Sequence, residues 1–250
     1  MSQSQSPIAP WISRCSAWAR GLTLLAVATG GVSLLLARYD IIPKLAGFAG
    51  FVGGALIALI ALLLALVGLF GTRRRGLPMG GMTLAAASIA LLYAGFILTR
   101  PLAAGDAPAL HDVTTDLASP PQFEQIKLRA DNLAGVNTLE NWKQLHAASY
   151  SDLKPIIVPG NVTDATRRAA AVAERLGWTL VAANTAKGHI EATDAVSFIR
   201  FYDDIVIRVV PAGDGGASRV DVRSVSRIGI SDFGVNARRI RAFRDAMLVG

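Results

Sequence analysis

The sequence contains very little cysteine and histidine. Its 250 residues include one cysteine, Cys15, so no disulfide can form within the chain. A zinc site built from cysteines is excluded for the same reason. The three histidines all lie after residue 110, together with nearly all of the acidic side chains. Any chemistry must therefore sit in the C-terminal part of the chain.

Charge is missing from three long stretches in the first hundred residues. The predicted membrane spans cover about residues 21–37, 46–70 and 78–98, and an uncharged apolar run of about 18 residues is long enough to be such a candidate. A soluble core helix would rarely be apolar all round. The second and third runs hold no ionisable residue, which argues against an ion or proton pathway. We expect residues 1–100 to form a three-helix transmembrane anchor, followed by a linker over residues 101–109.

The first run also allows an alternative interpretation as a signal peptide. Arg14 and Arg20 would then be its basic flank. The small-x-small cleavage site is missing, however, because Ala37 is followed at once by Arg38 and Tyr39. The sequence therefore favours an uncleaved anchor.

Basic residues are divided unevenly between the two sides of the predicted spans. The flanks on one side carry Arg14, Arg20, Arg73, Arg74 and Arg75. The flanks on the other side carry Arg38, Lys44 and Arg100. The side richer in Lys and Arg is normally cytoplasmic, so three spans place the C-terminal domain outside the cytoplasm. In a Gram-negative bacterium this predicts a multi-pass inner-membrane protein with a periplasmic domain.

The net charge of +7 belongs mainly to the membrane anchor. Seven Lys and Arg residues and one Asp lie before Arg100, which leaves 18 basic and 17 acidic residues from Arg100 onward. The domain is thus nearly neutral, and its charge does not predict nucleic-acid binding. The partners we expect are the lipid bilayer and an envelope protein or an anionic ligand.

Residues 110–250 have the pattern of one soluble α+β domain. Thr163 can cap a helix that ends before Gly177, and a last helix covers about residues 236–248. Between them the period-two pattern predicts strands near residues 178–183, 189–198, 204–210 and 219–228. Their short connections favour an antiparallel sheet of about four to five strands with helices on one face. Residues 122–159 show only a weak pattern.

Several ordered motifs in this region resemble a known family. They are HDVTTD at residues 111–116, PPQF at 120–123, IEAT at 190–193, FYDDIVIR at 201–208, DVRSVSR at 221–227 and SDFGVN at 231–236. The pattern is similar to that of the bacterial domain of unknown function numbered fourteen ninety-nine. The resemblance covers most of residues 110–248 and leaves out the membrane segment. It implies no activity, cofactor or site residue.

Strand alternation predicts that one face of the sheet is aliphatic and the other polar. We call the second face the polar sheet face; its predicted residues are His189, Glu191, Thr193, Asp204, Arg208, Asp221 and Arg223. These residues can simply form surface ion pairs across neighbouring strands. They can also line a ligand site covered by residues 122–159, in which Arg208 and Arg223 bind an anionic group and Glu191 or Asp204 orients it. The candidate ligand residues are Glu191, Asp204, Arg208, Asp221 and Arg223.

A second candidate site is the segment containing His111, Asp112 and Asp116. One histidine and two carboxylates can bind zinc or iron, although the two carboxylates can equally well cap turns. A metal-dependent enzyme or a hydrolase is therefore the alternative to a binding module. Ser224, Ser226 and Ser231 lack the glycines of a nucleophile elbow. We expect no cofactor, and the lack of a complete catalytic constellation favours binding over catalysis.

Overall fold

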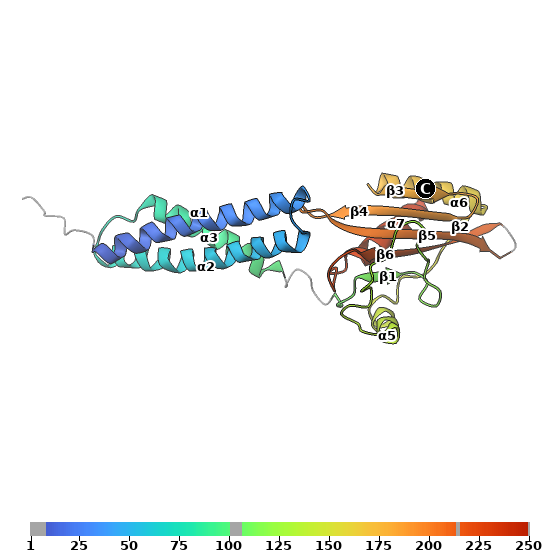
Figure 1. The fold of residues 1–250 in the computed structure, drawn as a ribbon, viewed down its shortest axis with the longest axis horizontal. Coiled ribbons are helices and arrows are strands. Elements are labelled where there is room, and N and C mark those ends of the chain that lie inside the picture. The colour runs from blue at the N-terminus through green and yellow to red at the C-terminus, as the bar shows by residue number, and fades with distance from the viewer. Residues whose placement is uncertain (1–8, 101–106, 214–215, 250) are drawn as a thin grey trace, which may run out of the picture. The chain divides into compact units, whose positions relative to one another are not determined.

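The computed structural model describes residues 9–100, 107–213 and 216–249 and is drawn as a ribbon in Figure 1. The chain folds into two compact units, residues 1–103 and residues 104–250. Each unit has a hydrophobic core of its own.

Three helices make up the first unit: α1 (Pro10–Arg38), α2 (Lys44–Arg74) and α3 (Gly81–Leu98). All three are long and apolar enough to cross a membrane. Helix α1 begins earlier than the predicted span because a proline suits the first turn of a helix, so Arg14 and Arg20 lie within it. The prediction of three helices that could span a membrane is confirmed.

Small residues allow the three helices to pack closely. A Cβ atom at Gly54 would collide with the hydroxyl of Tyr93 and approach the Ala26 carbonyl oxygen. The Tyr93 hydroxyl crosses from α3 to α2, where it donates to the Phe51 carbonyl at 2.6 Å. Small residues within these helices thus allow the close packing of this bundle.

The second unit is an α+β domain built on one antiparallel sheet. Its strands are β1 (Asp112–Thr114), β2 (Ile156–Pro159), β3 (Thr179–Asn184), β4 (His189–Val196), β5 (Phe201–Ala212) and β6 (Ala217–Ser226). The order is β1-β6-β5-β4-β3, and β2 pairs with β6 as well. Strand β5 runs along the whole of one edge of β6, so β1 and β2 follow each other along its other edge. The predicted antiparallel α+β fold is confirmed, with six strands where four to five were expected.

Helices α6 (Val162–Arg175) and α7 (Val235–Val249) cover the aliphatic face of the sheet. This face carries Ile190, Ile205, Ile207, Val209, Val220 and Val222, all at most 1% exposed. Against it pack Ala169 and Val172 of α6 and Ile240 and Phe243 of α7. Burying these side chains is the main favourable contribution to the fold, at about 25 cal/mol per Å² of apolar surface removed from water.

The segment from residue 122 to residue 159 contains two elements that its weak pattern did not predict, helix α5 (Leu139–Ser149) and strand β2. Helix α5 buries only Trp142 and His146, so it shows no apolar stripe in the sequence. These two side chains bind the free backbone groups of the edge strand β1. The Trp142 indole donates to the Asp112 carbonyl at 2.9 Å, and the Thr114 N–H donates to His146 Nε2 at 3.0 Å.

The ends of the two covering helices are fixed by capping residues. Thr163 was expected to cap α6, but the side chain of Asn161 does so and accepts the Asp164 N–H at 2.9 Å. Gly177 follows α6 with a φ of 86°, as its predicted capping position requires. Before α7, the Asp232 carboxylate accepts the N–H groups of Gly234 and Asn236 at 2.8 and 2.6 Å.

Candidate functional site

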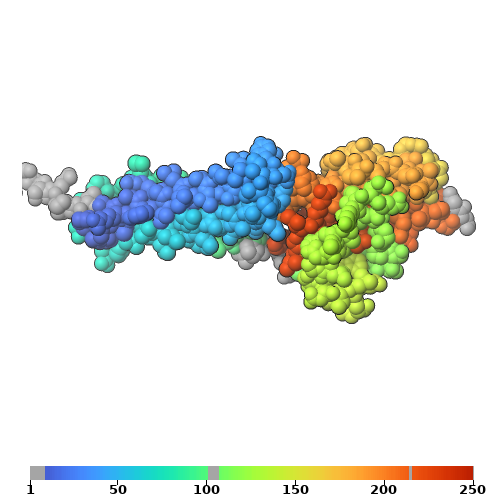
Figure 2. Space-filling model, in the orientation of Figure 1, coloured from blue at the N-terminus to red at the C-terminus, as the bar shows by residue number. Residues whose placement is uncertain are grey.

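The strand registers place the predicted polar residues on one face of the sheet, opposite α6 and α7. His189 lies opposite Arg208, Thr193 opposite Asp204, and Arg208 opposite Asp221. Most of these side chains are buried, including Glu191 and Asp221 at 0% exposure. Glu191, Arg208 and Arg223 contact the segment from Asp116 to Asn132, which we call the cover segment. In Figure 2 it lies in green in front of the orange and red strands.

Glu191 holds the cover segment through the backbone. Its carboxylate accepts the consecutive N–H groups of Glu124, Gln125 and Ile126, the last two at 2.9 and 2.6 Å. Its Oε1 atom also lies 2.9 Å from His189 Nε2. Burial alone would raise the pKa of Glu191, but the hydrogen bonds from Gln125, His189, Glu124 and Ile126 outweigh it and hold this pKa below its usual value. The carboxylate thus fills a nest of amide groups that could otherwise bind an anion.

Arg223 binds one residue of β1 and one residue near the start of the cover segment. Its guanidinium binds Asp112 in a bidentate pair, with Nε–Oδ1 at 3.0 Å and NH2–Oδ2 at 2.7 Å. It also donates to the Pro121 carbonyl at 3.3 Å. The two side chains of the pair are 9% and 3% exposed, so this is a buried ion pair. Arg223 is therefore occupied by groups of its own chain.

Arg208 and Arg219 bind two carboxylates between them. Arg208 NH2 lies 2.9 Å from Asp116 and 2.8 Å from Asp221, and Arg219 contacts the same two residues at 2.7 and 3.0 Å. The pKa of Asp116 is lowered, because the Ser119 N–H and the two arginines outweigh the effect of its burial. Both arginine side chains keep about a third of their surface exposed, at 30% and 36%.

Asp204 is the remaining candidate on this face, and it pairs with Arg227, which directly follows β6. It accepts from Arg227 at 2.8 and 2.9 Å and from the Thr193 hydroxyl at 3.0 Å. The five candidate ligand residues therefore share one face, as the strand alternation predicts. Each of them is engaged by the chain itself, and mainly they bind the cover segment to the sheet.

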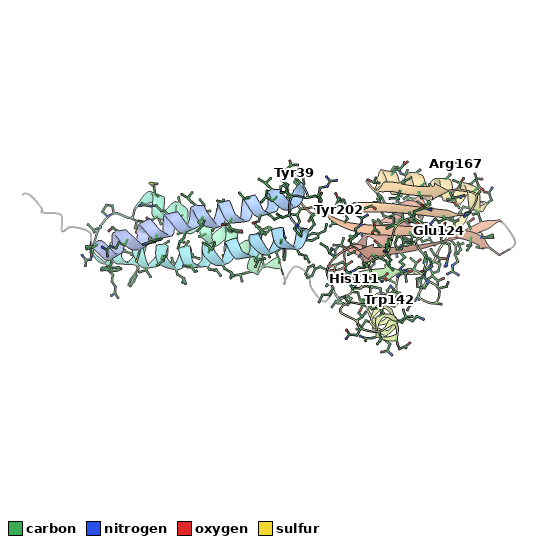
Figure 3. All side chains as sticks on the ribbon, in the orientation of Figure 1. Tyr39, His111, Glu124, Trp142, Arg167 and Tyr202 are labelled. Atoms are coloured by element: carbon green, nitrogen blue, oxygen red, sulfur yellow. The ribbon has the colours of Figure 1, made fainter. Side chains whose placement is uncertain are left out.

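The structure does not bring His111, Asp112 and Asp116 together as metal ligands. Among the described residues no group of three or more His, Cys, Asp or Glu is placed to hold a metal ion. Asp112 and Asp116 are committed to arginines, and His111 is buried at 2% exposure. Burial and the charge of Arg129 lower the pKa of His111. Figure 3 labels His111, which directly precedes β1, and Trp142, which lies in α5.

A second polar cluster lies under α7 and was not predicted. Arg239, 7% exposed, binds Asp203 at 2.7 Å and Asp194 at 3.0 Å and also donates to the Ser224 hydroxyl. Asn236 accepts from that hydroxyl at 2.6 Å and donates to the His111 carbonyl at 3.0 Å. The sequence held a signal for this cluster. Asp203 is two residues before Ile205 on β5, so both side chains point to the same face of the sheet. Asn236 and Arg239 are three residues apart and therefore lie on one face of α7.

Beside this cluster an open, shallow cavity of about 450 Å³ lies between α7, the end of β4 and the end of α6. Its walls are largely apolar, and they include Trp178, Val196 and Ala242. Arg238, Arg239 and Asp194 supply the charged groups. Apolar walls with a few convergent polar groups are typical of small-molecule sites. A further hollow of about 340 Å³ is lined only by the loop from Gln122 to Leu128.

Residues 112–247 match the protein-family model described as "Protein of unknown function (DUF1499)". This range is more than half of the chain. The protein belongs to the DUF1499 family. The DUF1499 match contains the whole sheet, the cover segment, the Arg239 cluster and all residues of the cavity, and it leaves out the three apolar helices. No curated protein matches the chain.

Proposed function

We propose that this protein is a membrane-anchored, non-enzymatic binding module whose DUF1499 domain lies outside the cytoplasm and takes up a small amphipathic ligand with an anionic group. The observation that carries the proposal is the cavity between α7 and the end of β4. An apolar chain fits the walls formed by Trp178, Val196 and Ala242. An anionic group fits Arg238, whose side chain is exposed at the same cavity.

The arginines of the polar sheet face already form ion pairs within the chain, which favours ligand binding at this cavity over binding at that face. An anion at Arg223 would have to displace Asp112, and one at Arg208 would compete with Asp116 and Asp221. Removing one partner of a buried pair leaves an uncompensated charge, which is costly. Arg238 makes a neutral contact instead, a donation to the Phe233 carbonyl at 3.0 Å.

The extracytoplasmic location rests on the positive-inside rule. The cluster of Arg73, Arg74 and Arg75 lies at the C-terminal end of α2, and an odd number of spans puts the domain on the opposite side of the membrane. In a Gram-negative cell this side is the periplasm, so the ligand would come from the envelope.

Calorimetric titration of the full chain in phosphatidylcholine nanodiscs tests the ligand site, with octyl phosphate below its micellar concentration as the probe and empty nanodiscs as the blank. We expect saturable binding. Arg238→Gln should weaken it roughly tenfold or more, since a hydrogen bond to a charged group contributes about 1.5–3 kcal/mol. Ala242→Phe should abolish it by filling the cavity.

Arg241→Gln is the matched control, because Arg241 lies on the same helix but pairs with Asp152 at 2.7 Å away from the cavity. Its affinity for octyl phosphate should equal that of the unchanged chain. The proposal fails if the titration does not saturate above the empty-disc blank, or if Arg238→Gln and Arg241→Gln weaken binding equally.

A further inference from the structure

The start of the domain, the β4–β5 turn and the turn after β6 lie at the same end of the sheet. Strand β4 ends at Val196, which pairs with Phe201, and β6 ends at Ser226, which pairs with Asp203. The chain enters the domain at the same end, because the Ser226 N–H donates to the His111 carbonyl. Figure 1 shows the β4–β5 turn and the end of β6 together at this end of the sheet.

Large apolar side chains are exposed on the two turns at this end. Phe198 in the β4–β5 turn is 53% exposed, and Ile230 and Phe233 between β6 and α7 are 55% and 58% exposed. The turn carrying the last two touches the entering chain. The Asp232 N–H donates to the Leu110 carbonyl at 3.0 Å, and the Ser231 hydroxyl donates to the Pro108 carbonyl at 3.4 Å.

The exposed charges around these side chains are basic. Arg200, Arg227 and Arg238 are exposed, whereas the carboxylates of Asp203, Asp204 and Asp232 are buried at 3%, 5% and 8% exposure. Asp131 is also exposed here, but Arg129 binds both of its oxygens, at 2.8 and 2.7 Å. The described part of this end therefore presents aromatic and aliphatic side chains with arginines, which is the composition of surfaces that lie in the headgroup layer of a membrane.

The length of the tether brings a bilayer within reach. Residues 101–107 separate Arg100, next to the last apolar helix, from Pro108 at this end of the domain. Seven residues span at most about 25 Å even when fully extended. The end of the domain that carries the apolar side chains is thus the end to which this short tether is joined.

We propose that Phe198, Arg200, Ile230 and Phe233 form a membrane-contact surface that rests in the headgroup layer of the bilayer in which the protein is anchored, and that anionic lipid strengthens this contact. The surface holds the domain in one orientation on the lipid. The proposal does not rest on the octyl phosphate site, although Ser197 and Arg238 also line that cavity, and it holds for either side of the membrane.

Fluorescence quenching in nanodiscs tests this contact with the full chain. In a Cys15→Ser background, an environment-sensitive dye is placed at Ser197→Cys, beside the proposed surface. A second preparation carries it at Ala186→Cys, in the β3–β4 turn at the opposite end of the sheet. The nanodiscs contain phosphatidylcholine with a nitroxide on the headgroup, with or without an equal amount of phosphatidylglycerol. We expect quenching at Ser197 that increases with phosphatidylglycerol and no quenching at Ala186.

The variant Arg200→Gln/Ile230→Ser/Phe233→Ser should lose the quenching at Ser197. Ile157→Ser is the matched control, because Ile157 is equally exposed at 55% but lies on β2, which pairs with the first residues of β6, away from the tether. It should keep the quenching, and unfolding curves should confirm that both variants are folded. Equal quenching at Ser197 and Ala186, or unchanged quenching in the triple variant, overturns the proposal. Protection of Ser197 from aqueous iodide without quenching by the lipid nitroxide also overturns it, because protein would then cover the surface.

Discussion

Buried arginines organise the polar interior of this domain. Arg223 and Arg239 are each 7% exposed, and each binds a carboxylate that is buried as well. A buried ion pair adds little to stability in comparison with apolar residues of the same volume, because both charges are taken out of water. The loss of one partner is a different case, since the other charge then remains buried without compensation. Individual arginines should therefore be hard to replace.

Replacing Arg223 with alanine should lower the free energy of unfolding by about 3–5 kcal/mol, because Asp112 is left as an unpaired buried charge. Arg241→Ala breaks a bidentate pair with Asp152 of similar length, but its partners are 34% and 48% exposed, so the loss should stay at about 1 kcal/mol or less. The measurement is denaturant unfolding of the full chain in detergent, followed by the fluorescence of Trp142 and Trp178 in a Trp11→Phe/Trp18→Phe background. Equal losses for the two variants would contradict the buried pair.

The stability of the domain should fall as the pH decreases below about 6.5. Burial lowers the pKa of His146 from its ordinary 6.5, so below that value the unfolded chain binds a proton that the folded domain excludes. His146→Gln retains an oxygen that can accept the Thr114 N–H but cannot be protonated. Unfolding curves between pH 7.5 and pH 5, a window set by that ordinary pKa, should give a shallower loss for the variant. A slope equal to that of the unchanged chain would refute this role of His146.

Strand alternation was sufficient to predict which residues share the polar sheet face, because a strand directs successive side chains to opposite faces. It could not predict their partners. Glu191 binds backbone N–H groups 65 to 67 residues earlier in the chain, and no side-chain pattern marks such an acceptor. The metal hypothesis arose for the same reason. Asp112 and Asp116 look like free ligands in the sequence, whereas their arginine partners are about a hundred residues away.

At the scale of elements, the cover segment is irregular in backbone and is nonetheless held at defined points. Glu191 binds its middle, Arg208 and Arg219 bind Asp116 at its start, and Asn132 at its end donates to Asp112. Glu124, labelled in Figure 3, is one of the residues whose N–H groups bind the Glu191 carboxylate. The segment is thus attached by side chains of the sheet and contributes few apolar contacts of its own.

Glu191→Gln should release the middle of the cover segment while the sheet remains folded, because an amide oxygen is a weaker acceptor for three N–H groups than a carboxylate. Hydrogen exchange of residues 122–128 should become faster in the variant, and exchange in β5 should not change. Lowering the pH should have a similar effect on the unchanged chain. Since the pKa of Glu191 lies below its usual 4.5, its contribution is present above that value and is lost as the pH falls through the lower folded value.

Glu140→Gln provides the matched control for that experiment. Glu140 is an exposed residue in the first turn of α5 and is remote from the sheet face. Its replacement should leave the exchange of residues 122–128 unchanged. An unchanged exchange rate in Glu191→Gln itself would show that the segment is held by other contacts.

The elements that the sequence predicted are those with strong periodicity. Helix α6, strands β4, β5 and β6 and helix α7 each bury a regular set of apolar residues, while β3 alternates between exposed and half-buried positions. Helix α5 and strand β2 do not, since α5 buries one aromatic and one histidine and β2 is four residues long. Their positions depend on the edges of β1 and β6, which are tertiary features.

At the scale of the whole molecule, the apolar helices and the DUF1499 domain differ in charge as well as in hydropathy. Six of the seven units of net positive charge belong to residues before Arg100. The anchor therefore carries the information on membrane orientation, and the nearly neutral domain does not. Orientation and ligand binding can be tested separately.

Fusions after Gly250 test the proposed orientation. We expect alkaline phosphatase to be active and green fluorescent protein to be dark, since a domain outside the cytoplasm exports both reporters. Replacing Arg73, Arg74 and Arg75 with glutamine removes three of the five positive charges that keep these flanks in the cytoplasm. This change should reduce the phosphatase activity. A fluorescent fusion protein with an inactive phosphatase would reverse the assignment.

The pairing of β1 with β6 has a consequence for how the domain is made. Asp112 and Arg223 lie 111 residues apart, so the first strand and the last strand of the domain must meet before the sheet is complete. Contacts between distant parts of a chain slow folding, because the loop must close before any contact compensates for its entropy. No N-terminal portion of the domain can assemble this sheet during synthesis. The sheet of the nascent domain is therefore complete only once β6, its last strand, has been made.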